Sequence, residues 1–389
     1  MGAWKALLGI LVLAVVSASC SSGSSTSRPP QESDDLVSRD APAPPPCTPA
    51  SLEERASRVL IVGLPETTSS ADPLVSEVVD VGVGGVLLTH TNVQSELQVE
   101  GLVSTLKATS RAPLLVAADE EPGRVRTFED LIGYTPSARR MAAEESEAEV
   151  EDRARSLGTF LSGVGVDLNL APVADLDDGP WDGIVGDRSF SADPLDASRF
   201  SLAYARGLSS AGVTPVIKHF PGHGRATDDS HFDLPTVSEP LAVLESTDLR
   251  PFADAVTAGA PVVMMGHVAY DALDRGLPAS VSPAAYRLLR EMGFRGAAIT
   301  DSLGMGAVNL RWDFDEAAVL AVAAGADGVL ATDGNQARRM RDALVTAVQT
   351  DRLDEIRLNE ASGRMMALAG GDTAALSCTS PELPVFGRP

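Results

Sequence analysis

The sequence predicts an α/β fold, a single-domain (β/α)8 barrel of the TIM type. Short runs rich in Val, Ile and Leu recur eight times, longer segments with helical periodicity separate them, and no glycine-rich phosphate loop follows an early run. Strands that are apolar on both faces and alternate with helices form parallel sheets covered on both sides. Eight such units favour a closed barrel over an open doubly wound sheet, which usually carries the glycine-rich loop.

The eight apolar runs are the expected barrel strands. In chain order they are RVLIVGL from Arg58, GVLLTH from Gly85, PLLVAAD from Pro113, VDLNLAPV from Val166, VTPVIKHF from Val213, PVVMMGH from Pro261, AAITD from Ala297 and DGVLA from Asp327. Intervening segments such as DASRFSLAYARGLSSAG and DEAAVLAVAAGA repeat Ala, Leu and Val at three- and four-residue steps and end near Gly, as amphipathic helices do. The barrel and a C-terminal tail are therefore expected over residues 51–389.

The first 19 residues predict a secretory signal peptide. Lys5 precedes an unbroken apolar run from Ala6 to Val16, and small residues follow up to Cys20. Because small residues ending at a cysteine resemble a bacterial lipobox, we expect Cys20 to carry a lipid and to become the mature N-terminus; secretion without lipid is the alternative. The run is shorter than the roughly 20 residues that cross a bilayer. The expected location is outside the cell membrane, with lipid as the anchor.

Residues 20–50 are predicted to form a flexible tether, because they are rich in Ser, Pro, Asp and Glu and offer little to bury. Cys47 and Cys378 lie near the two ends of the mature chain, in a compartment that permits oxidation. We predict that these two cysteines form a disulfide. Two unpaired thiols are the alternative, since sequence alone does not show that the ends meet.

Composition and charge limit the classes of function. A hydrophobic content of 44% is enough for a large core, and the length after residue 50 fits one barrel better than two average domains. The formal net charge of -23 argues against nucleic-acid binding, which depends on neutralising phosphates with Lys and Arg.

Ionisable residues close many of the apolar runs. In barrels of this type the chemistry lies at the C-terminal ends of the strands, so position makes such residues candidates. Taken singly, each is equally well explained as a helix cap or a satisfied polar residue at a loop start. Their convergence, and the placement of every histidine at a strand end or in the loop after the fifth run, favours a site. These residues are Asp119, Asp175, Lys218, His219, His267 and Asp301, with His90, His223 and His231 as the remaining histidines.

Three histidines fall within KHFPGHGRATDDSH, residues 218–231. A zinc site is the competing interpretation of such a cluster. Pro221 and Gly222 argue against it, because they interrupt the helix that would place two of these histidines on one face. We expect no metal and no cofactor. Asp229 and His231 are spaced so that the carboxylate can fix the tautomer of an imidazole that gives and takes a proton. Spacing alone leaves a turn with a capping Asp as the alternative.

The segment KHFPGHGRATDDSH, with GDRSF at residues 186–190 and ITDSLGM at residues 299–305, resembles glycoside hydrolase family 3. More narrowly, it is similar to the single-barrel β-N-acetylglucosaminidases of that family, which act on peptidoglycan fragments. The resemblance covers nearly the whole barrel, with the motifs in the family's order. It implies a retaining exo-β-N-acetylglucosaminidase that needs no cofactor and that takes N-acetylglucosamine-containing peptidoglycan fragments as substrates.

The resemblance also implies roles for individual residues. Asp301 matches the family's nucleophile, and His231 with Asp229 matches its acid/base pair. The positions that bind the sugar match Asp119, Arg188, Lys218 and His219, and His267 at the end of the sixth run is a further substrate-binding candidate.

One segment departs from the family pattern. The family usually has Asp-Gln-Glu-Gly-Gly-Arg followed by a second arginine, whereas residues 119–124 read DEEPGR and Thr127 stands where that arginine is expected. We expect Arg126 to replace it in binding the sugar. Two other functions remain open: a phosphorylase, because imidazole repels an anionic acceptor less than a carboxylate does, and an inactive cell-wall-binding lipoprotein, because of the altered segment.

Overall fold

The computed structural model describes residues 47–387. The predicted signal peptide, Cys20 and nearly all of the predicted tether lie outside the described residues and stay predictions. Within the described part, no helix has the length and apolar character needed to cross a membrane.

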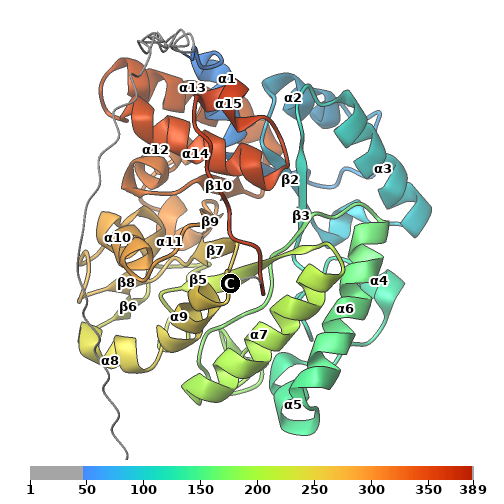
Figure 1. Cartoon of the computed structure of the whole chain (residues 1–389), viewed down its shortest axis with the longest axis vertical. Coiled ribbons are helices and arrows are strands. Elements are labelled where there is room, and N and C mark those ends of the chain that lie inside the picture. Colours follow the sequence, from blue (N-terminus) through green and yellow to red (C-terminus); the bar gives the residue numbers. More distant parts are fainter. Residues whose placement is uncertain (1–46, 388–389) are drawn as a thin grey trace, which may run out of the picture. The chain divides into compact units, whose positions relative to one another are not determined.

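Eight parallel strands close into a barrel in the order β1-β10-β9-β7-β5-β4-β3-β2 (Figure 1). Each strand overlaps one of the eight apolar runs, so the predicted (β/α)8 fold is confirmed. The strands are β1 (Leu60–Gly63), β2 (Gly85–Leu88), β3 (Leu115–Ala118), β4 (Leu168–Asn169), β5 (Thr214–Phe220), β7 (Val262–Met265), β9 (Ala297–Ser302) and β10 (Gly328–Ala331).

Helices surround the barrel, as Figure 1 shows. All but the last two residues of the segment DASRFSLAYARGLSSAG lie within one of them, α7, which begins after Asp193. The side chain of Asp193 accepts the N–H groups of Leu195 and Asp196, and Pro194 fixes the first turn. The surrounding helices are α2 (Pro73–Val81), α3 (Glu96–Thr109), α6 (Glu147–Gly163), α7 (Pro194–Ser210), α9 (Arg250–Thr257), α10 (Pro283–Glu291), α12 (Phe314–Ala324) and α13 (Ala337–Gln349).

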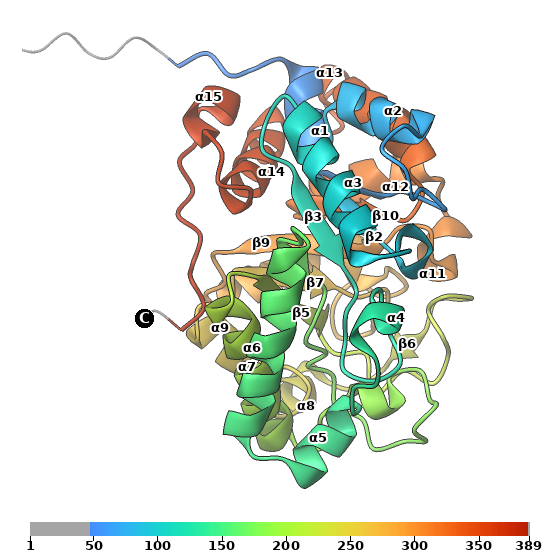
Figure 2. The same cartoon turned by 90° about the vertical axis from the view of Figure 1, so that its right-hand side faces the viewer.

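Short elements interrupt the loops that follow several strands. Figure 2 shows α4, α11 and β6 together on one side of the barrel, and β6 pairs with β8 in a separate two-stranded sheet. The short elements are η1 (His90–Asn92), α4 (Glu129–Ile132), α5 (Ala138–Glu144), η2 (Gly186–Arg188), β6 (Thr236–Val237), α8 (Leu241–Ser246), β8 (Ala269–Tyr270), η3 (Ala279–Val281), α11 (Gly306–Asn309) and η4 (Gly334–Gln336).

The N-terminal end of the barrel is closed by α14 (Glu355–Leu368). Met365 of this helix packs with the inward-facing side chains of the strands, including Ile61 and Ile299. A Cβ built on Gly328, the first residue of β10, would lie 3.0 Å from the Met365 sulfur. The barrel interior is therefore a filled apolar core that α14 closes at this end. A functional site is expected at the opposite end, where the strands have their C-terminal ends.

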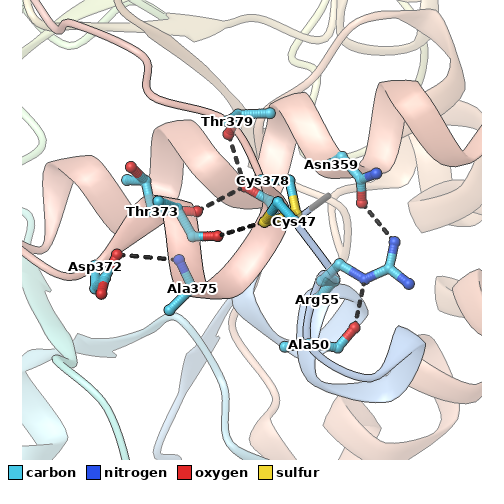
Figure 3. Close-up of a disulfide and its surroundings, with 11 residues drawn as sticks. Cys47, Ala50, Arg55, Asn359, Asp372, Thr373, Ala375, Cys378 and Thr379 are labelled. Atoms are coloured by element: carbon cyan, nitrogen blue, oxygen red, sulfur yellow. Dashed lines mark hydrogen bonds between the residues drawn. A yellow bond between two sulfur atoms is a disulfide. The ribbon is translucent and has the colours of Figure 1, made fainter. Parts of the chain in front are cut away.

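A disulfide joins Cys47 to Cys378, with the two Cα atoms 5.8 Å apart and a sequence separation of 331 (Figure 3). The predicted disulfide is confirmed. It lies beside α15 (Thr373–Ser377), where Ala50 N–H also donates to the Leu376 carbonyl at 2.9 Å. Figure 2 shows α14 and α15 on the side of the barrel opposite α4 and α11. Both ends of the described chain are thus fastened at the closed end of the barrel.

Candidate active site

A cavity of about 150 Å³ lies at the C-terminal ends of the strands. It brings together residues from four strands, β3, β4, β5 and β9, or the loops that follow them, which are far apart in sequence. Six of the residues predicted from the sequence line it: Asp119, Arg188, Lys218, His219, His231 and Asp301. The other lining residues are Val125, Ile184, Val185, His223, Ser230 and Met305.

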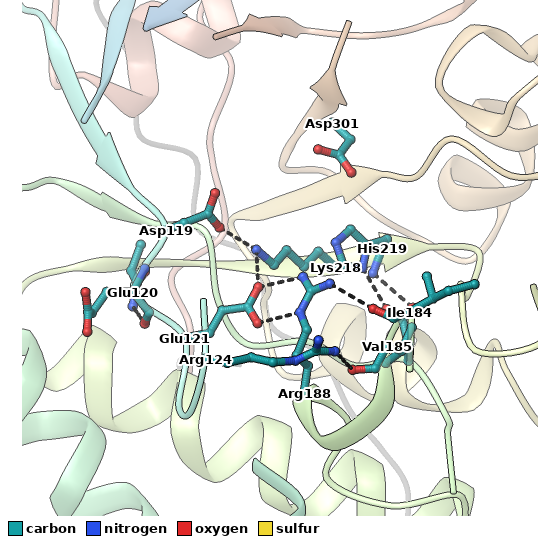
Figure 4. Close-up of polar contacts among 12 residues, drawn as sticks. Asp119, Glu120, Glu121, Arg124, Ile184, Val185, Arg188, Lys218, His219 and Asp301 are labelled. Atoms are coloured by element: carbon teal, nitrogen blue, oxygen red, sulfur yellow. Dashed lines mark hydrogen bonds and ion pairs between the residues drawn. The ribbon is translucent and has the colours of Figure 1, made fainter. Parts of the chain in front are cut away.

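Asp301 lies near the end of β9 and faces Lys218 and His219 across the site (Figure 4). One of its carboxylate oxygens accepts the N–H of Ser302 at 2.7 Å. Burial alone would raise the pKa of Asp301, but the nearby rings of His267 and His219, together with that N–H, outweigh burial and hold its pKa at about 2. Asp301 is therefore ionised near neutral pH, which is the state that a carboxylate nucleophile needs.

His231 lies on the loop that follows β5, with Asp229 behind it. Asp229 Oδ1 is 2.6 Å from His231 Nδ1 and accepts the backbone N–H of His231 at 2.9 Å. Burial raises the pKa of Asp229, but its hydrogen bonds to His231 more than offset this and hold the pKa below its usual value. An ionised carboxylate at Nδ1 favours the tautomer that carries its proton there. The other nitrogen, Nε2, is left to exchange a proton with a substrate.

The start of α11 holds this loop in place. The N–H of Gly306 donates to the His231 carbonyl, and the N–H of Ala307 donates to the Ser230 carbonyl, both at 3.0 Å. The Ser230 hydroxyl lies 2.9 Å from Nε2 of the buried His223. Burial lowers the pKa of His223 to about 4, so its ring is neutral. These three contacts keep His231 at the wall of the cavity.

A group of charged side chains forms the wall opposite Asp301 (Figure 4). Lys218 Nζ donates to Asp119 Oδ1 at 2.6 Å and lies 2.7 Å from Glu121 Oε1. Arg188 donates to both oxygens of Glu121 at 2.8 Å. Burial raises the pKa of Glu121, but the charges of Arg188 and Lys218 outweigh it and keep that pKa far below its usual range. Glu121 thus fixes both cations, whose remaining N–H groups can bind hydroxyl groups.

His219 is held from behind in a similar way. Its Nδ1 lies 2.7 Å from Asp175 Oδ2. The other oxygen of Asp175 accepts the backbone N–H groups of His219 and His223 at 3.1 and 2.7 Å. Burial raises the pKa of Asp175, but the nearby histidines lower it further than burial raises it. The ionised carboxylate therefore orients His219 toward the cavity.

The histidines of residues 218–231 each have a protein partner instead of converging on one point. His219 contacts Asp175, His223 contacts Ser230 and His231 contacts Asp229. Among residues 47–387, no group of three or more His, Cys, Asp or Glu side chains is arranged to hold a metal ion.

Arg126 does not line the cavity, contrary to the sequence-based expectation. Its side chain is 3% exposed, and its Nε lies 2.8 Å from Glu120 Oε1. Residues 120 and 126 form an antiparallel bridge, which turns both side chains away from Asp119. Thr127, in the place of the family's second arginine, uses its hydroxyl to bond the carbonyls of Leu88 and Asp119. Arg126 therefore supports the loop and lies outside the cavity lining.

His267 also differs from its predicted role, because both of its ring nitrogens are used inside the protein. Nδ1 lies 2.7 Å from the Ser280 hydroxyl and Nε2 lies 2.8 Å from the Ser302 carbonyl. Its side chain is fully buried, and burial lowers its pKa. His267 thus fixes the end of β9 next to Asp301 instead of contacting a substrate.

Glu121 is the main site residue that the sequence reasoning missed. A signal for it existed: Glu121 follows Asp119 by two residues, and side chains two apart in an extended chain point the same way. Figure 4 shows Asp119 and Glu121 directed toward Lys218, with Glu120 directed away.

Comparison with known proteins adds independent information. Residues 51–368 match the model of the glycosyl hydrolase family 3 N-terminal domain. Beta-hexosaminidase LpqI of Mycobacterium tuberculosis is 34% identical over 328 residues, which cover 82% of this chain and 83% of that protein. A beta-hexosaminidase of Xylella fastidiosa (strain M12) is 38% identical over 260 residues, which cover 64% of this chain and 76% of that protein.

Solved structures show the same similarity. A family 3 glycosyl hydrolase from Mycobacterium smegmatis matches with a TM-score of 0.78 and 36% identity, covering 82% of this chain and 97% of that one. A family 3 beta-N-acetylglucosaminidase from Paenibacillus sp. FPU-7 matches with a TM-score of 0.79 and 30% identity, covering 85% of this chain and 64% of that one.

Proposed function

Because this chain belongs to glycoside hydrolase family 3 and is a glycoside hydrolase, we propose that it is a retaining exo-β-N-acetylglucosaminidase. Its substrates are muropeptides or disaccharides derived from peptidoglycan, from which it releases N-acetylglucosamine. One observation carries the proposal: an ionised carboxylate, Asp301, and an imidazole backed by a carboxylate, His231, line the same cavity. The names of the hexosaminidase relatives support the choice of sugar.

In the first chemical step, Asp301 attacks the anomeric carbon of the terminal sugar and forms a glycosyl-enzyme. His231 gives its Nε2 proton to the departing glycosidic oxygen. In the second step, His231 takes a proton from water, which attacks the same carbon and releases Asp301. Two displacements at one carbon retain its configuration. Asp229 stabilises the imidazolium at each transfer, because its carboxylate lies at Nδ1.

The charged wall positions the sugar for this attack. Asp119, Lys218, Arg188 and His219 line the cavity and offer acceptors and donors for ring hydroxyls. Holding the anomeric carbon against Asp301 converts binding energy into rate. Glu121 and Asp175 act behind this set by keeping its cations and its imidazole in place.

A trapping experiment tests the proposal. A 5-fluoro-N-acetylglucosaminyl fluoride should form a slow glycosyl-enzyme, and peptide mass spectrometry should place the adduct on Asp301. Asp301→Asn should give no adduct. Aryl N-acetylglucosaminide should be cleaved far better than aryl glucoside. An adduct on another residue would overturn the assignment of Asp301, and absence of turnover with both aryl glycosides would favour a binding lipoprotein instead.

A phosphorylase is the second candidate, and the observation that favours it is the imidazole at the acid/base position. An imidazole repels an incoming phosphate less than a second carboxylate would. If hydrolysis is the reaction, adding phosphate should leave turnover unchanged and give free N-acetylglucosamine. Formation of the sugar 1-phosphate, with faster turnover, would establish phosphorolysis.

The proposed location is the outer face of the cell membrane, with a lipid on Cys20. Support comes from the order of charged, apolar and small residues before Cys20. The mature protein should fractionate with membranes, and Cys20→Ser should release it. A Cys20→Ser protein that stays in the membrane fraction would contradict the lipid anchor.

A further inference from the structure

Exposed aromatic side chains gather on the side of the barrel that holds the cavity. Within residues 47–387, the exposed aromatic residues are Tyr134, Trp181 and Phe232. They lie in the loops that follow β3, β4 and β5, respectively. Exposed aliphatic residues show no such preference, since Ile356 lies on α14 at the closed end. A single exposed apolar residue needs no explanation, so the observation to explain is that all three aromatic residues lie on the side of the barrel that holds the cavity.

Phe232 is the member of this set that lies closest to the chemistry. It follows His231 directly, its side chain is 76% exposed, and the two ring centres are 6.5 Å apart. The backbone of the loop that carries Phe232 is held in place. A Cβ built on Gly306 would lie 2.7 Å from the Phe232 carbonyl carbon, so α11 supports the backbone at close contact. The ring is therefore presented to solvent from a supported position.

The position of Phe232 relative to His231 defines what it would meet. In the proposed function, His231 donates a proton to the glycosidic oxygen, which requires that oxygen within about 3 Å of Nε2. The group bonded to that oxygen is the leaving group, so it lies on the same side as His231. A sugar ring attached there falls within reach of a phenyl ring whose centre is 6.5 Å from the imidazole.

We propose that Phe232 forms a platform for the sugar unit on the leaving-group side of the substrate, with its phenyl face against the C–H face of that sugar. The proposal rests on the proposed function, because His231 defines the leaving-group side. Such a platform selects substrates that carry a second ring over those with a small leaving group. It also buries an aromatic face that is otherwise exposed to water.

The test compares two substrates that share the N-acetylglucosaminyl group but differ in the leaving group. N,N′-diacetylchitobiose carries a second sugar ring, whereas β-N-acetylglucosaminyl fluoride carries none. In Phe232→Ala, the ratio of kcat/KM for the disaccharide to kcat/KM for the fluoride should fall about three- to tenfold, the size of one aromatic contact. Phe232→Tyr should restore the ratio. Ile356→Ala, an exposed apolar residue on α14, is the matched control and should leave both values unchanged.

The possible outcomes distinguish loss of the platform from other causes of a lower kcat/KM. An unchanged ratio in Phe232→Ala overturns the platform, even if both values fall, because an equal fall means that the loop or His231 has moved. A lower ratio that Phe232→Tyr does not restore also overturns stacking. If the wild-type enzyme cleaves neither N-acetylglucosaminide, the proposed function fails. The ratio is then measured with the disaccharide and fluoride of whichever sugar the enzyme accepts, so the platform is tested separately.

Discussion

Replacing Asp229 with asparagine isolates the charge behind the proposed acid/base. Asp229 Oδ1 lies 2.6 Å from His231 Nδ1 and 2.9 Å from its backbone nitrogen. Asparagine keeps an oxygen in this place, so both hydrogen bonds can persist and only the negative charge is removed. Asp229→Asn should therefore lose the part of the rate that comes from stabilising the imidazolium.

The exposure of the pair sets the size of this loss. The side chains of Asp229 and His231 are 35% and 62% exposed, so water screens their attraction. Unit charges about 4 Å apart attract by about 1 kcal/mol in water and about 4 kcal/mol at the effective dielectric constant of a protein surface. For this exposed pair about 1–2 kcal/mol is appropriate, which corresponds to a roughly 5- to 30-fold lower kcat/KM. Asp229→Ala also removes the hydrogen bonds and should lose at least about 10²-fold.

A series of aryl N-acetylglucosaminides with increasingly good leaving groups measures this effect. A good leaving group needs little help from a proton, so the loss in kcat/KM caused by Asp229→Asn should shrink along the series. An equal loss for every leaving group would refute a role for Asp229 through proton transfer. Wild-type kcat/KM with the poorest leaving group would show that the Asp229 charge does not stabilise the imidazolium.

Three further predictions concern the charges around the site and the closed end of the barrel. Glu121→Gln removes the carboxylate that Arg188 and Lys218 share and leaves Lys218 with Asp119 alone, so it should lower the free energy of unfolding by about 3–5 kcal/mol and reduce kcat/KM; wild-type thermal stability would contradict this. The pKa of Asp301 is held at about 2, against about 3.9 in an unfolded chain, so its ionised form stabilises the fold above about pH 4 and this contribution is lost as the pH falls toward 2. Asp301→Asn should therefore flatten the pH dependence of the unfolding free energy in that window, and an unchanged slope in urea titrations would argue against it. Replacing Cys47 and Cys378 with serine should lower the unfolding free energy by about 2–5 kcal/mol but retain kcat in the folded enzyme; loss of kcat without unfolding would show that the bridge reaches the site.

The strands were predictable because each is a short run that is apolar on both faces. Runs of this kind occur mainly in parallel sheets whose two faces are both covered. The Cys47–Cys378 pair was predictable for a different reason, since two cysteines beyond Cys20 in a chain predicted to be exported allow only one bridge. Element boundaries were less certain: β4 has only two residues within the run VDLNLAPV, and Val173 near the end of that run pairs with Lys218 only through an isolated parallel bridge.

From the sequence, only residues that stand at strand ends or within a recognisable motif could be assigned to the site. Arg126 was misplaced because sequence does not show that residues 120 and 126 pair across a turn, which gives the arginine a buried partner in Glu120. His267 was misplaced because its partner Ser280 lies 13 residues away and its other partner lies on β9. Contacts of this kind depend on how loops fold over one another, and no local periodicity encodes them.

The bridge between Cys47 and Cys378 also decides which part of the barrel receives a pull from the upstream chain. The chain enters the barrel at Cys47, beside α15, whereas the catalytic opening lies at the other ends of the strands. Any attachment upstream of Cys47, including the proposed lipid on Cys20, therefore joins the barrel at the end opposite the cavity. Because the disulfide links Cys47 to the C-terminal segment at Cys378, a force applied to the chain upstream of Cys47 acts on both segments. It therefore does not detach α1 (Leu52–Arg58) first.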